Sequence, residues 1–471
     1  MNKFTKFYFL GIGGIGMSAI ARYYMAHGFE VAGYDRTKTM LTENLQSEGI
    51  DVSYDERESD IPVKFLDKVK TLVILTPAIP DDHQQLLFFR KQGFVVMKRA
   101  EVLGYITRLN KGICIAGTHG KTTTSTITAH LFRQSLVDCN AFLGGISNNY
   151  STNLLLSKES NFVVIEADEY DRSFHHLRPY MAVITSADAD HLDIYKTHQA
   201  VKESYEHFAS LVQPGGALIV RKGIDIHPEL QKGVKLYTYS MDEGGDFHAE
   251  NIKTKSGEIR FDFVTPTERI ANVRLGAPVK INVENSVAAM ALAWLSGVTS
   301  EELRTGLSSF SGIYRRFNIV YQSANLVYID DYAHHPSELR AGITSIKEMY
   351  PDKKITGIFQ PHLYSRTRDF ADEFAEVLST LDELILLDIY PARELPIDGV
   401  NPELILNKMT LVKKQYCQKE KLVDLLNKRD DLEVVVTFGA GDIDAMVPAI
   451  KRIMKSKKKV VDKGLLKVES E

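Results

Sequence analysis

The segment "GTHGKTTT", which begins at Gly117, contains the residue types that bind a nucleotide phosphate. A standard phosphate loop reads G-x-x-x-x-G-K-[ST]. Gly120, Lys121 and Thr122 supply its second half, but Ile115 stands where the first glycine belongs. The loop follows the apolar stretch "GICIA" and precedes a helix-forming segment, so backbone N–H groups and the helix dipole can bind an anion. Because Lys121 can reach a β- or γ-phosphate and the Thr122 hydroxyl can bind Mg²⁺, the sequence predicts a shortened loop for Mg·ATP.

Acidic residues gather at the ends of two predicted strands that follow this loop. The first segment provides Glu166, Asp168, Glu169 and Asp171, and the second provides Asp188, Asp190, His191 and Asp193. Mg²⁺ prefers oxygen ligands and keeps some of its waters. Glu169 could bridge two ions, whereas His191, on residue type alone, is more typical of a hydrogen-bonding histidine. The two segments predict a metal–nucleotide site in which His191 is the weakest member.

A second glycine-rich loop lies near the N-terminus. Gly11, Gly13 and Gly16 form G-x-G-x-x-G between a predicted strand and a predicted helix, with Gly14 inside the motif and Asp35 ending the next strand. Glycines at these positions allow a tight turn and let backbone N–H groups approach a pyrophosphate. These contacts do not distinguish NAD from a UDP-sugar. The alternative without a ligand is a strand-to-helix turn that merely tolerates glycine.

The elements that must position these loops alternate between short apolar strands and longer amphipathic segments. This pattern predicts an α/β fold with mostly parallel sheets covered on both faces, and the ligand-binding motifs fall at the carboxyl ends of strands. Polar and apolar residues alternate from about Asp246 to Val273, which predicts antiparallel hairpins at a sheet edge. A helix is expected over "NVENSVAAMALAWLSG". We place boundaries near 108 and 320, which gives domains 1–107, 108–320 and 321–471.

Composition excludes several classes of protein. A net charge of -4 gives no electrostatic case for nucleic acid, and the three cysteines are typical of a reducing compartment rather than of a disulfide framework. Glycines interrupt the N-terminal apolar run, which favours a strand, turn and helix over a signal peptide. No stretch reaches about 18 uninterrupted apolar residues, so we expect no membrane span and a cytoplasmic protein. The lysine-rich C-terminal end is expected to be solvated and partly disordered.

Taken together, the motifs resemble one family. The segments "GIGGIGMS", "GTHGKTTT", "EADEYDRSFHHL", "DADHLD", "RRF", "DDYAHHP" and "QPHLYSRTRD" occur in the order seen in Mur ligases, and the resemblance covers nearly the whole chain, more weakly over 221–275 and after 400. It implies three domains: an N-terminal Rossmann-like domain that binds a UDP-sugar, a central P-loop ATPase, and a C-terminal Rossmann-like domain that closes over the site.

The resemblance also implies roles for individual residues. The UDP-sugar would contact Gly11, Gly13, Gly14, Gly16, Ser18, Asp35, Arg99, Ser173 and His176. ATP would contact Gly117, Thr118, His119, Gly120, Lys121, Thr122, Thr123, Asn285, Arg316 and Asp331. The metal would be held by Thr122, Glu169 and His191; the amino acid by Tyr332, His334 and Arg366; and the catalytic set would be Lys121, His191, His335 and Arg366. Leu363 stands where some relatives carry an arginine, and Lys202 is the nearest but disfavoured counterpart of a carbamylated lysine.

The implied activity is ATP-dependent ligation of L-alanine to the lactyl carboxylate of UDP-N-acetylmuramate, with Mg²⁺ or Mn²⁺, by a monomer or homodimer in peptidoglycan precursor synthesis. One alternative is a recycling ligase that adds a murein tripeptide to the same nucleotide. From other classes, an NAD-dependent oxidoreductase would leave the G-K-T loop unexplained, and a non-catalytic nucleotide switch would leave the C-terminal histidines and arginines unused. Taken singly, paired histidines such as His334 and His335 before Pro336 can simply cap a helix.

Overall fold

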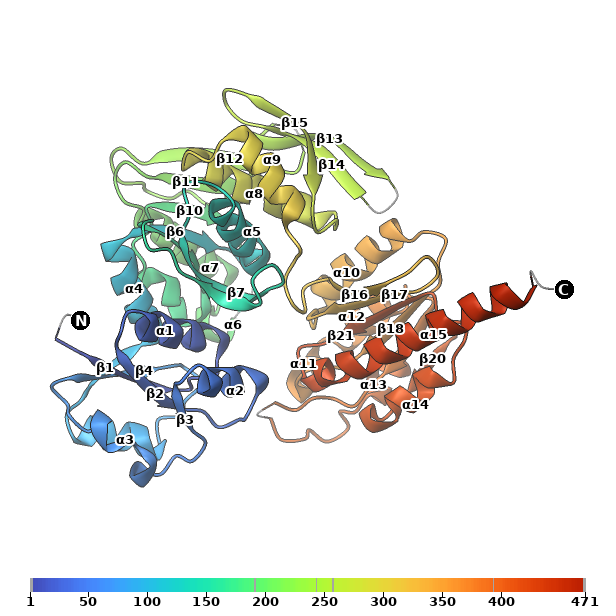
Figure 1. The fold of residues 1–471 in the computed structure, drawn as a ribbon, viewed down its shortest axis with the longest axis horizontal. Helices are drawn as coiled ribbons and strands as arrows, with labels where there is room; N and C mark the ends of the chain where they lie inside the picture. Colours follow the sequence, from blue (N-terminus) through green and yellow to red (C-terminus); the bar gives the residue numbers. More distant parts are fainter. Residues whose placement is uncertain (1–2, 190–191, 243, 256–257, 393, 469–471) are drawn as a thin grey trace. The chain divides into compact units, whose positions relative to one another are not determined.

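The structure is a computed structural model that describes residues 3–189, 192–242, 244–255, 258–392 and 394–468. The chain forms two compact units, one of Met1–Pro278 with Asn282–Ser311 and one of Val279–Ile281 with Gly312–Glu471. The described residues form one sheet of five strands, one of ten and one of six (Figure 1). The second unit begins a few residues before position 320, which lies inside strand β16; the domain boundaries near 108 and 320 stay predictions.

The first sheet is parallel throughout and has the order β3-β2-β1-β4-β5. Side chains alternate between its faces: Phe7 and Phe9 enter one apolar core, and Tyr8 and Leu10 enter the other. The strands are β1 (Lys6–Leu10), β2 (Glu30–Tyr34), β3 (Asp51–Ser53), β4 (Thr71–Leu75) and β5 (Val95–Lys98). Between and after them lie α1 (Ile15–Ala26), α2 (Met40–Ser47), η1 (Glu58–Asp60), η2 (Val63–Phe65), α3 (Gln84–Lys91) and α4 (Arg99–Leu109).

The second sheet has the order β15-β14-β13-β12-β11-β10-β6-β9-β7-β8. It is parallel from β7 to β13, and the meander β13–β14–β15 at its edge is antiparallel, as the alternating residues predict. Its strands are β6 (Lys111–Ala116), β7 (Asn140–Ser147), β8 (Thr152–Leu155), β9 (Phe162–Glu166), β10 (Met181–Ile184), β11 (Ala217–Arg221), β12 (Lys235–Ser240), β13 (Phe247–Lys255), β14 (Glu258–Val264) and β15 (Arg269–Leu275). The helices are α5 (Lys121–Arg133), η3 (Tyr170–His176), α6 (Leu192–Tyr195), α7 (His198–Ser210), α8 (Ile281–Leu295) and α9 (Ser300–Ser309).

Helix α1 joins the first two sheets into one unit. It packs against β7 and β8 of the second sheet, and one continuous apolar core runs through both sheets. The fully buried Asn153 of β8 donates from its Nδ2 to the carbonyl oxygen of Ile15 (2.5 Å) and to the hydroxyl of Ser18 (3.1 Å), and accepts from Arg22 (2.8 Å). The first turn of α1, which follows the first glycine loop, is therefore held by a side chain of the second sheet.

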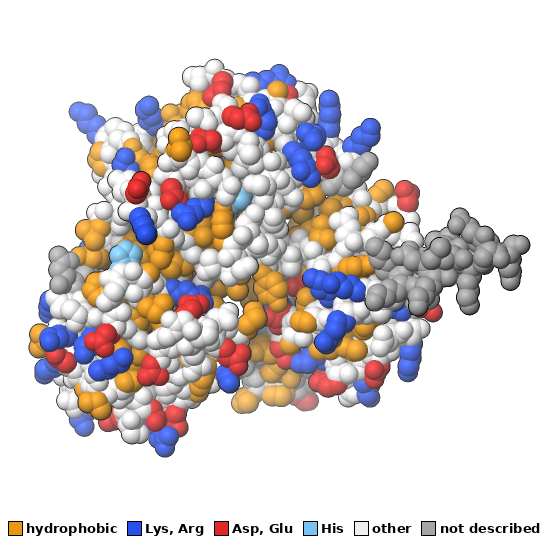
Figure 2. All heavy atoms as spheres, in the orientation of Figure 1, with side chains coloured by type: hydrophobic (Ala, Val, Ile, Leu, Met, Phe, Trp, Pro, Cys, Tyr) orange, Lys and Arg blue, Asp and Glu red, His pale blue; other side chains and the backbone are white. Residues whose placement is uncertain are grey.

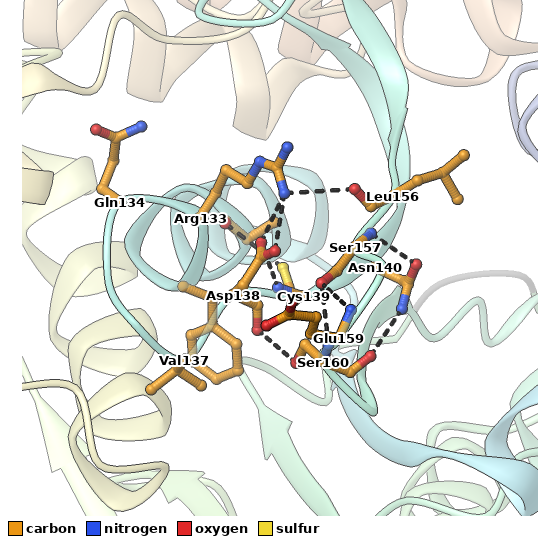
Figure 3. A network of polar contacts seen from close by, with 12 residues as sticks. Arg133, Gln134, Val137, Asp138, Cys139, Asn140, Leu156, Ser157, Glu159 and Ser160 are labelled. Atoms are coloured by element: carbon orange, nitrogen blue, oxygen red, sulfur yellow. Dashed lines mark hydrogen bonds and ion pairs between the residues drawn. The ribbon is translucent and has the colours of Figure 1, made fainter.

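Polar contacts hold the far end of α5 (Figure 3). Arg133 contacts both carboxylate oxygens of Asp138, at 2.8 and 2.9 Å, and Asp138 has the left-handed φ of 49°. The Ser160 hydroxyl donates to the carbonyl oxygen of Asp138 (2.8 Å), and the Asn140 amide donates to that of Ser160 (3.2 Å). The end of α5 is thereby tied to the starts of β7 and β9.

The third sheet has the order β16-β17-β21-β18-β19-β20, antiparallel only between β16 and β17, with an apolar cluster on each face. Its strands are β16 (Asn318–Gln322), β17 (Val327–Asp331), β18 (Ile355–Phe359), β19 (Glu383–Leu386), β20 (Lys414–Tyr416) and β21 (Val434–Phe438). The helices are α10 (Pro336–Met349), α11 (Tyr364–Asp369), α12 (Ala371–Leu378), α13 (Glu403–Leu406), η4 (Lys419–Lys421), α14 (Leu422–Asn427), η5 (Asp442–Met446) and α15 (Val447–Val468). The lysine-rich end expected to be partly disordered is thus helical through Val468.

Surface charge is mixed on the face that Figure 2 shows, where lysine and arginine side chains alternate with aspartate and glutamate. Within the described residues, no helix combines the length and apolarity that a membrane crossing needs.

Candidate functional site

The phosphate loop connects β6 to α5 and depends on two glycines with positive φ. Gly117 has φ 135°, and a Cβ atom there would lie 2.0 Å from the hydroxyl oxygen of Thr185; Gly120 has φ 80° at the N-cap of α5. Ile115, which stands where a longer loop has its first glycine, is buried inside β6 opposite Val183 of β10. The loop is short because the strand continues through that position.

Lys121 lies in the first turn of α5 with its ammonium folded back over the loop. The Nζ atom donates to the carbonyl oxygens of Gly117 (2.6 Å) and Thr118 (3.2 Å) and forms an ion pair with Glu169 Oε1 (2.9 Å). Burial by itself lowers the pKa of Lys121, but the neighbouring carboxylates of Glu169 and Glu166 outweigh it and raise the pKa, so the side chain is a cation at neutral pH.

Two hydroxyl side chains at the end of β10 hold the loop backbone. The Thr185 hydroxyl donates to the carbonyl oxygen of His119 (2.5 Å), and the Ser186 hydroxyl accepts from the N–H of His119 (2.9 Å). Thr118 exchanges hydrogen bonds with the backbone of Asp188 (3.2 and 3.0 Å). Sequence reasoning missed Thr185 and Ser186, because their position beside the loop depends on the pairing of β10 with β6.

The Glu169 carboxylate and the Thr122 hydroxyl, which are proposed to hold the metal, offer the oxygen ligands that Mg²⁺ prefers. Glu169 is 4% exposed and lies beside Lys121, while Thr122 is the next residue of the same helix turn and is buried. His191, the third predicted ligand, lies outside the described residues. Within the described ranges no three His, Cys, Asp or Glu side chains gather as a metal cage. Mg²⁺ binds with one or two carboxylates, waters and substrate phosphates rather than in an all-protein cage, so this donor set fits the ion bound with ATP.

The first glycine loop is closed by Asp35 rather than left open. The Gly13 N–H donates to Asp35 Oδ2 (2.7 Å), and Gly11 has φ 85°. A Cβ atom on Gly16 would lie 2.4 Å from a guanidinium nitrogen of Arg99. Gly14 is the N-cap of α1 and has no side chain to cap it. Gly11 therefore provides a left-handed turn, and Gly16 makes room for Arg99, which lies directly against the loop.

Arg99 links the first glycine loop to the acidic turn that carries Glu169. Its guanidinium forms an ion pair with Asp168 (2.8 Å), one residue before Glu169, and Lys98 pairs with Asp171 (2.8 Å). Ser173 and His176 follow in η3, where His176 is exposed and its carbonyl lies against Gly104 of α4. The predicted nucleotide-sugar residues of η3 and α4 thus lie in one neighbourhood, beside the carboxylates of the phosphate site.

Asn285 of α8 reaches the phosphate loop. Its Oδ1 accepts from the Thr124 hydroxyl (3.3 Å) and would lie 2.7 Å from a Cβ on Gly120. Thr123 is partly exposed in the same turn of α5. Lys202, the disfavoured counterpart of a carbamylated lysine, lies on α7. It forms an ion pair with Asp225 in the loop after β11 (2.6 Å).

In the second unit, two arginines stack on Tyr332. The guanidinium groups of Arg315 and Arg316 lie 4.9 and 5.1 Å from the centre of its ring. Arg315 also donates to the carbonyl oxygen of Gly439 (2.5 Å), so it is a structural anchor, whereas the Arg316 guanidinium makes no such contact with the backbone of the described residues. Burial raises the pKa of Asp331 to about 6, against the opposing charge of Arg316.

The neighbouring histidines have different environments. His335 is the N-cap of α10, and its Nδ1 accepts from the N–H of Ser337 (3.4 Å), so the helix-capping interpretation holds for this residue. His334 Nδ1 faces the carbonyl oxygen of Tyr332 (3.0 Å) and a carboxylate oxygen of Glu338 (3.3 Å). Both of these atoms accept, so the hydrogen is on Nδ1 and the neutral ring presents a basic Nε2. Burial lowers the pKa of His334, partly offset by Glu338.

Arg366 lies in the first turns of α11, next to a residue in an unusual conformation. Its guanidinium is 3.4 Å from His362 Nδ1, and the His362 ring stacks on Tyr390. Leu363, the N-cap of α11, has φ 72°, which is uncommon for a residue with a side chain. The Leu363 N–H donates to the Tyr390 carbonyl oxygen (2.9 Å), which holds the turn in place.

Comparison with family models matches the chain over most of its length. Residues 6–111 match the model described as Mur ligase family, catalytic domain; residues 115–293 match the Mur ligase middle domain; and residues 315–441 match the Mur ligase, glutamate ligase domain. The chain belongs to the Mur ligase family. The resemblance of the ordered motifs and the three-part α/β fold are therefore confirmed.

Curated relatives of this Mur ligase are similar over almost their full length. The UDP-N-acetylmuramate--L-alanine ligase of Parabacteroides distasonis is 57% identical over 454 residues, which are 96% of this chain and 98% of the relative. The enzyme of the same name from Porphyromonas gingivalis is 54% identical over 96% of this chain and 99% of the relative.

Among solved structures, the UDP-N-acetylmuramate-alanine ligase of Thermotoga maritima has a TM-score of 0.80 and 26% identity, and the alignment covers 96% of this Mur ligase and 99% of that chain. A murein peptide ligase from Psychrobacter arcticus has a TM-score of 0.67 at 20% identity, covering 96% and 98%, a likeness that shows the fold alone. An NAD-dependent oxidoreductase has no support in these matches to Mur ligases.

Proposed function

We propose that this Mur ligase joins L-alanine to the lactyl carboxylate of UDP-N-acetylmuramate and converts ATP to ADP and phosphate. Relatives with 57% and 54% identity over 96% of the chain carry this activity in their names. The observation that carries the proposal within the chain is the phosphate loop, where Lys121 pairs with Glu169. Arg99 lies against the first glycine loop and pairs with Asp168, the residue before Glu169.

The chemical problem is that a carboxylate is a poor electrophile, because its leaving group would be oxide. Transfer of the γ-phosphoryl group of ATP to a carboxylate oxygen releases ADP and forms an acyl phosphate. The neutral amine of L-alanine then attacks the acyl carbon, the carbon–oxygen bond to phosphate breaks, phosphate leaves with the bonding electrons, and the new amide nitrogen loses a proton. Exclusion of water protects the acyl phosphate from hydrolysis.

The first unit is proposed to bind the nucleotides. Lys121 and the N–H groups at the start of α5 would bind the phosphates, and Thr122, Glu169 and His191 would hold Mg²⁺ or Mn²⁺. When bound, the metal would neutralise negative charge on the phosphoryl oxygens. Gly11, Gly13, Gly14 and Gly16 with Arg99 would bind the pyrophosphate of the UDP-sugar. Asp35 is proposed to shape this loop, because it already accepts from the N–H of Gly13.

The second unit is proposed to bind the amino acid. Arg366 would pair with the L-alanine carboxylate, and Tyr332 would line the site. Among the candidate bases, His334 is favoured over His335 because its Nε2 is the basic nitrogen of a neutral ring, whereas His335 caps α10. We also propose a cytoplasmic enzyme, monomeric or homodimeric; the three free buried cysteines fit a reducing compartment.

One assay tests this function. The protein is incubated with UDP-N-acetylmuramate, ATP and Mg²⁺, and phosphate release is measured with L-alanine, glycine, L-serine or the murein tripeptide as the acceptor. We expect the highest kcat/KM with L-alanine. Preference for the tripeptide would assign the chain to the recycling reaction instead. If no acceptor gave phosphate release, a ligase of this class would be excluded.

A further inference from the structure

Tyr195 is a buried side chain that connects the two acidic segments. It ends α6, just after the segment that carries His191, and it contacts the turn that carries Glu169. Its hydroxyl donates to the backbone carbonyl oxygen of Glu169 (2.5 Å). The guanidinium group of Arg172 lies over its ring, 5.2 Å from the centroid. One tyrosine therefore contacts this turn with both its hydroxyl and its ring.

The turn after Glu169 has a conformation that its own residues do not favour. Asp171 and Arg172 have φ values of 51° and 52°, in the left-handed region that side chains rarely adopt. Such backbone persists only where the surroundings determine it. Arg172 N–H donates to the Glu169 carbonyl oxygen (3.0 Å), and Lys98 pairs with Asp171 (2.8 Å). Tyr195, two residues after the second acidic segment, contributes a hydrogen bond and a ring contact to this turn.

The hydrogen bonds through Tyr195 have one direction. The Glu169 carbonyl can only accept, so the Tyr195 hydroxyl donates to it and is free to accept from the Ser204 hydroxyl of α7 (3.3 Å). His175 Nε2 lies 3.1 Å from the Ser204 carbonyl oxygen, which can only accept, so this nitrogen carries the hydrogen and also faces the Ser204 hydroxyl oxygen as a donor (2.9 Å). The chain runs from His175 in η3 back to Glu169, and the hydrogen bonds in such a chain polarise one another.

We propose that Tyr195 is a positioning residue for the metal-binding carboxylate: it ties the Glu169 turn to the end of the segment that carries His191, and so sets where the Glu169 side chain can meet Mg²⁺ bound with ATP. The inference rests on the proposed function, since it takes Glu169 as a metal ligand. Its distinct content is that an uncharged residue that touches neither metal nor substrate governs metal affinity.

The test measures the affinity of the protein for Mn²⁺ in the presence of a non-hydrolysable ATP analogue, with electron paramagnetic resonance as the readout. Tyr195→Phe removes the hydroxyl and keeps the ring. Tyr328→Phe is the matched control, because Tyr328 is also buried, has a hydroxyl bonded to Thr437 (3.1 Å), and lies in the other unit. We expect roughly tenfold weaker Mn²⁺ binding by Tyr195→Phe, a matching rise in the Mg²⁺ concentration for half-maximal activity, and an unchanged KM for UDP-N-acetylmuramate. The control should bind Mn²⁺ like the wild type.

Each outcome decides a separate point. Wild-type Mn²⁺ affinity in Tyr195→Phe, with only a lower thermal midpoint, would overturn the positioning role and leave a purely structural one. If Tyr195→Phe does not fold, Ser204→Ala, which removes the donor to Tyr195, serves in its place and should weaken Mn²⁺ binding in the same direction by a smaller factor. Absence of Mn²⁺ binding by the wild type would instead overturn the metal site of the proposed function.

Discussion

Replacing Lys121 by methionine is the sharpest test of the phosphate loop. Methionine keeps a long unbranched side chain but removes the ammonium, so it creates little cavity while deleting the ion pair with Glu169 and the hydrogen bonds to Gly117 and Thr118. In the free enzyme the change leaves a buried carboxylate without its counter-charge. In the working enzyme it removes the cation expected at the γ-phosphate.

The structure sets the size of both effects. Two unit charges 2.9 Å apart attract by about 6 kcal/mol at an effective dielectric constant of about 20, and desolvation offsets much of this. Loss of one partner of a buried pair costs about 3–5 kcal/mol. We expect the lower end, because burial already raises the pKa of Glu169 and protonation can relieve its charge. Turnover should fall by about a hundredfold to a thousandfold, as for loss of one transition-state donor.

The free energy of unfolding is measured by urea titration, with the fluorescence of the chain's single tryptophan, Trp294 on α8, as the signal. Lys121→Met and Glu169→Gln are compared singly and together. We expect the double variant to be less destabilised than the sum of the single ones, because the two side chains are coupled. Phosphate release is measured in parallel. Full turnover by Lys121→Met would refute our assignment of the loop, and additive stability changes would refute the buried ion pair.

Three further predictions concern neighbouring features. Asn153→Ala should raise the KM for UDP-N-acetylmuramate several-fold with little change in kcat, because Asn153 holds the first turn of α1; steady-state kinetics in which kcat alone fell would contradict this. Gly117→Ala should abolish binding of an ATP analogue in calorimetry, because its Cβ would clash with Thr185, whereas Gly49→Ala, also at positive φ but in open space, should cost only about 1 kcal/mol of stability and leave binding intact. Burial lowers the pKa of His130 to about 4 from an ordinary 6.5, so the unfolded chain binds more protons between these values, and His130 should lower stability by up to about 3 kcal/mol as pH drops from 6.5 towards 4. Burial also lowers the pKa of His175 to about 4, so in His130→Gln the slope of the unfolding free energy against pH should become shallower than in the wild type without vanishing, and an unchanged slope would exclude His130 as a cause.

Local patterns predicted a large part of the fold. The strand–loop–helix units around Gly11 and Gly117 and the antiparallel hairpins near the sheet edge are where the sequence places them. These features depend on residues close together in the chain, such as a glycine that allows a positive φ or an alternation that matches the pleat of a strand. The missing first glycine at Ile115 also has a local cause, since that residue lies within β6.

Other features depend on contacts between residues far apart in the chain. Thr185 and Ser186 hold the phosphate loop only because β10 pairs with β6, an adjacency that no spacing along the chain reveals. Arg99 was predicted at the nucleotide sugar, yet its pairing with Asp168 required the first two sheets to be packed together.

The sequence by itself determined the chemistry available to this protein: a phosphate-binding lysine and hydroxyl, acidic residues for a metal, and the motif order of the Mur ligases. Only the tertiary structure decided which partner each group has. His334 and His335 are adjacent and identical in type, but the acceptors around His334 place its hydrogen on Nδ1, while His335 caps a helix. The physical reason is that hydrogen bonds and ion pairs act over a few ångströms in space, and folding sets those distances.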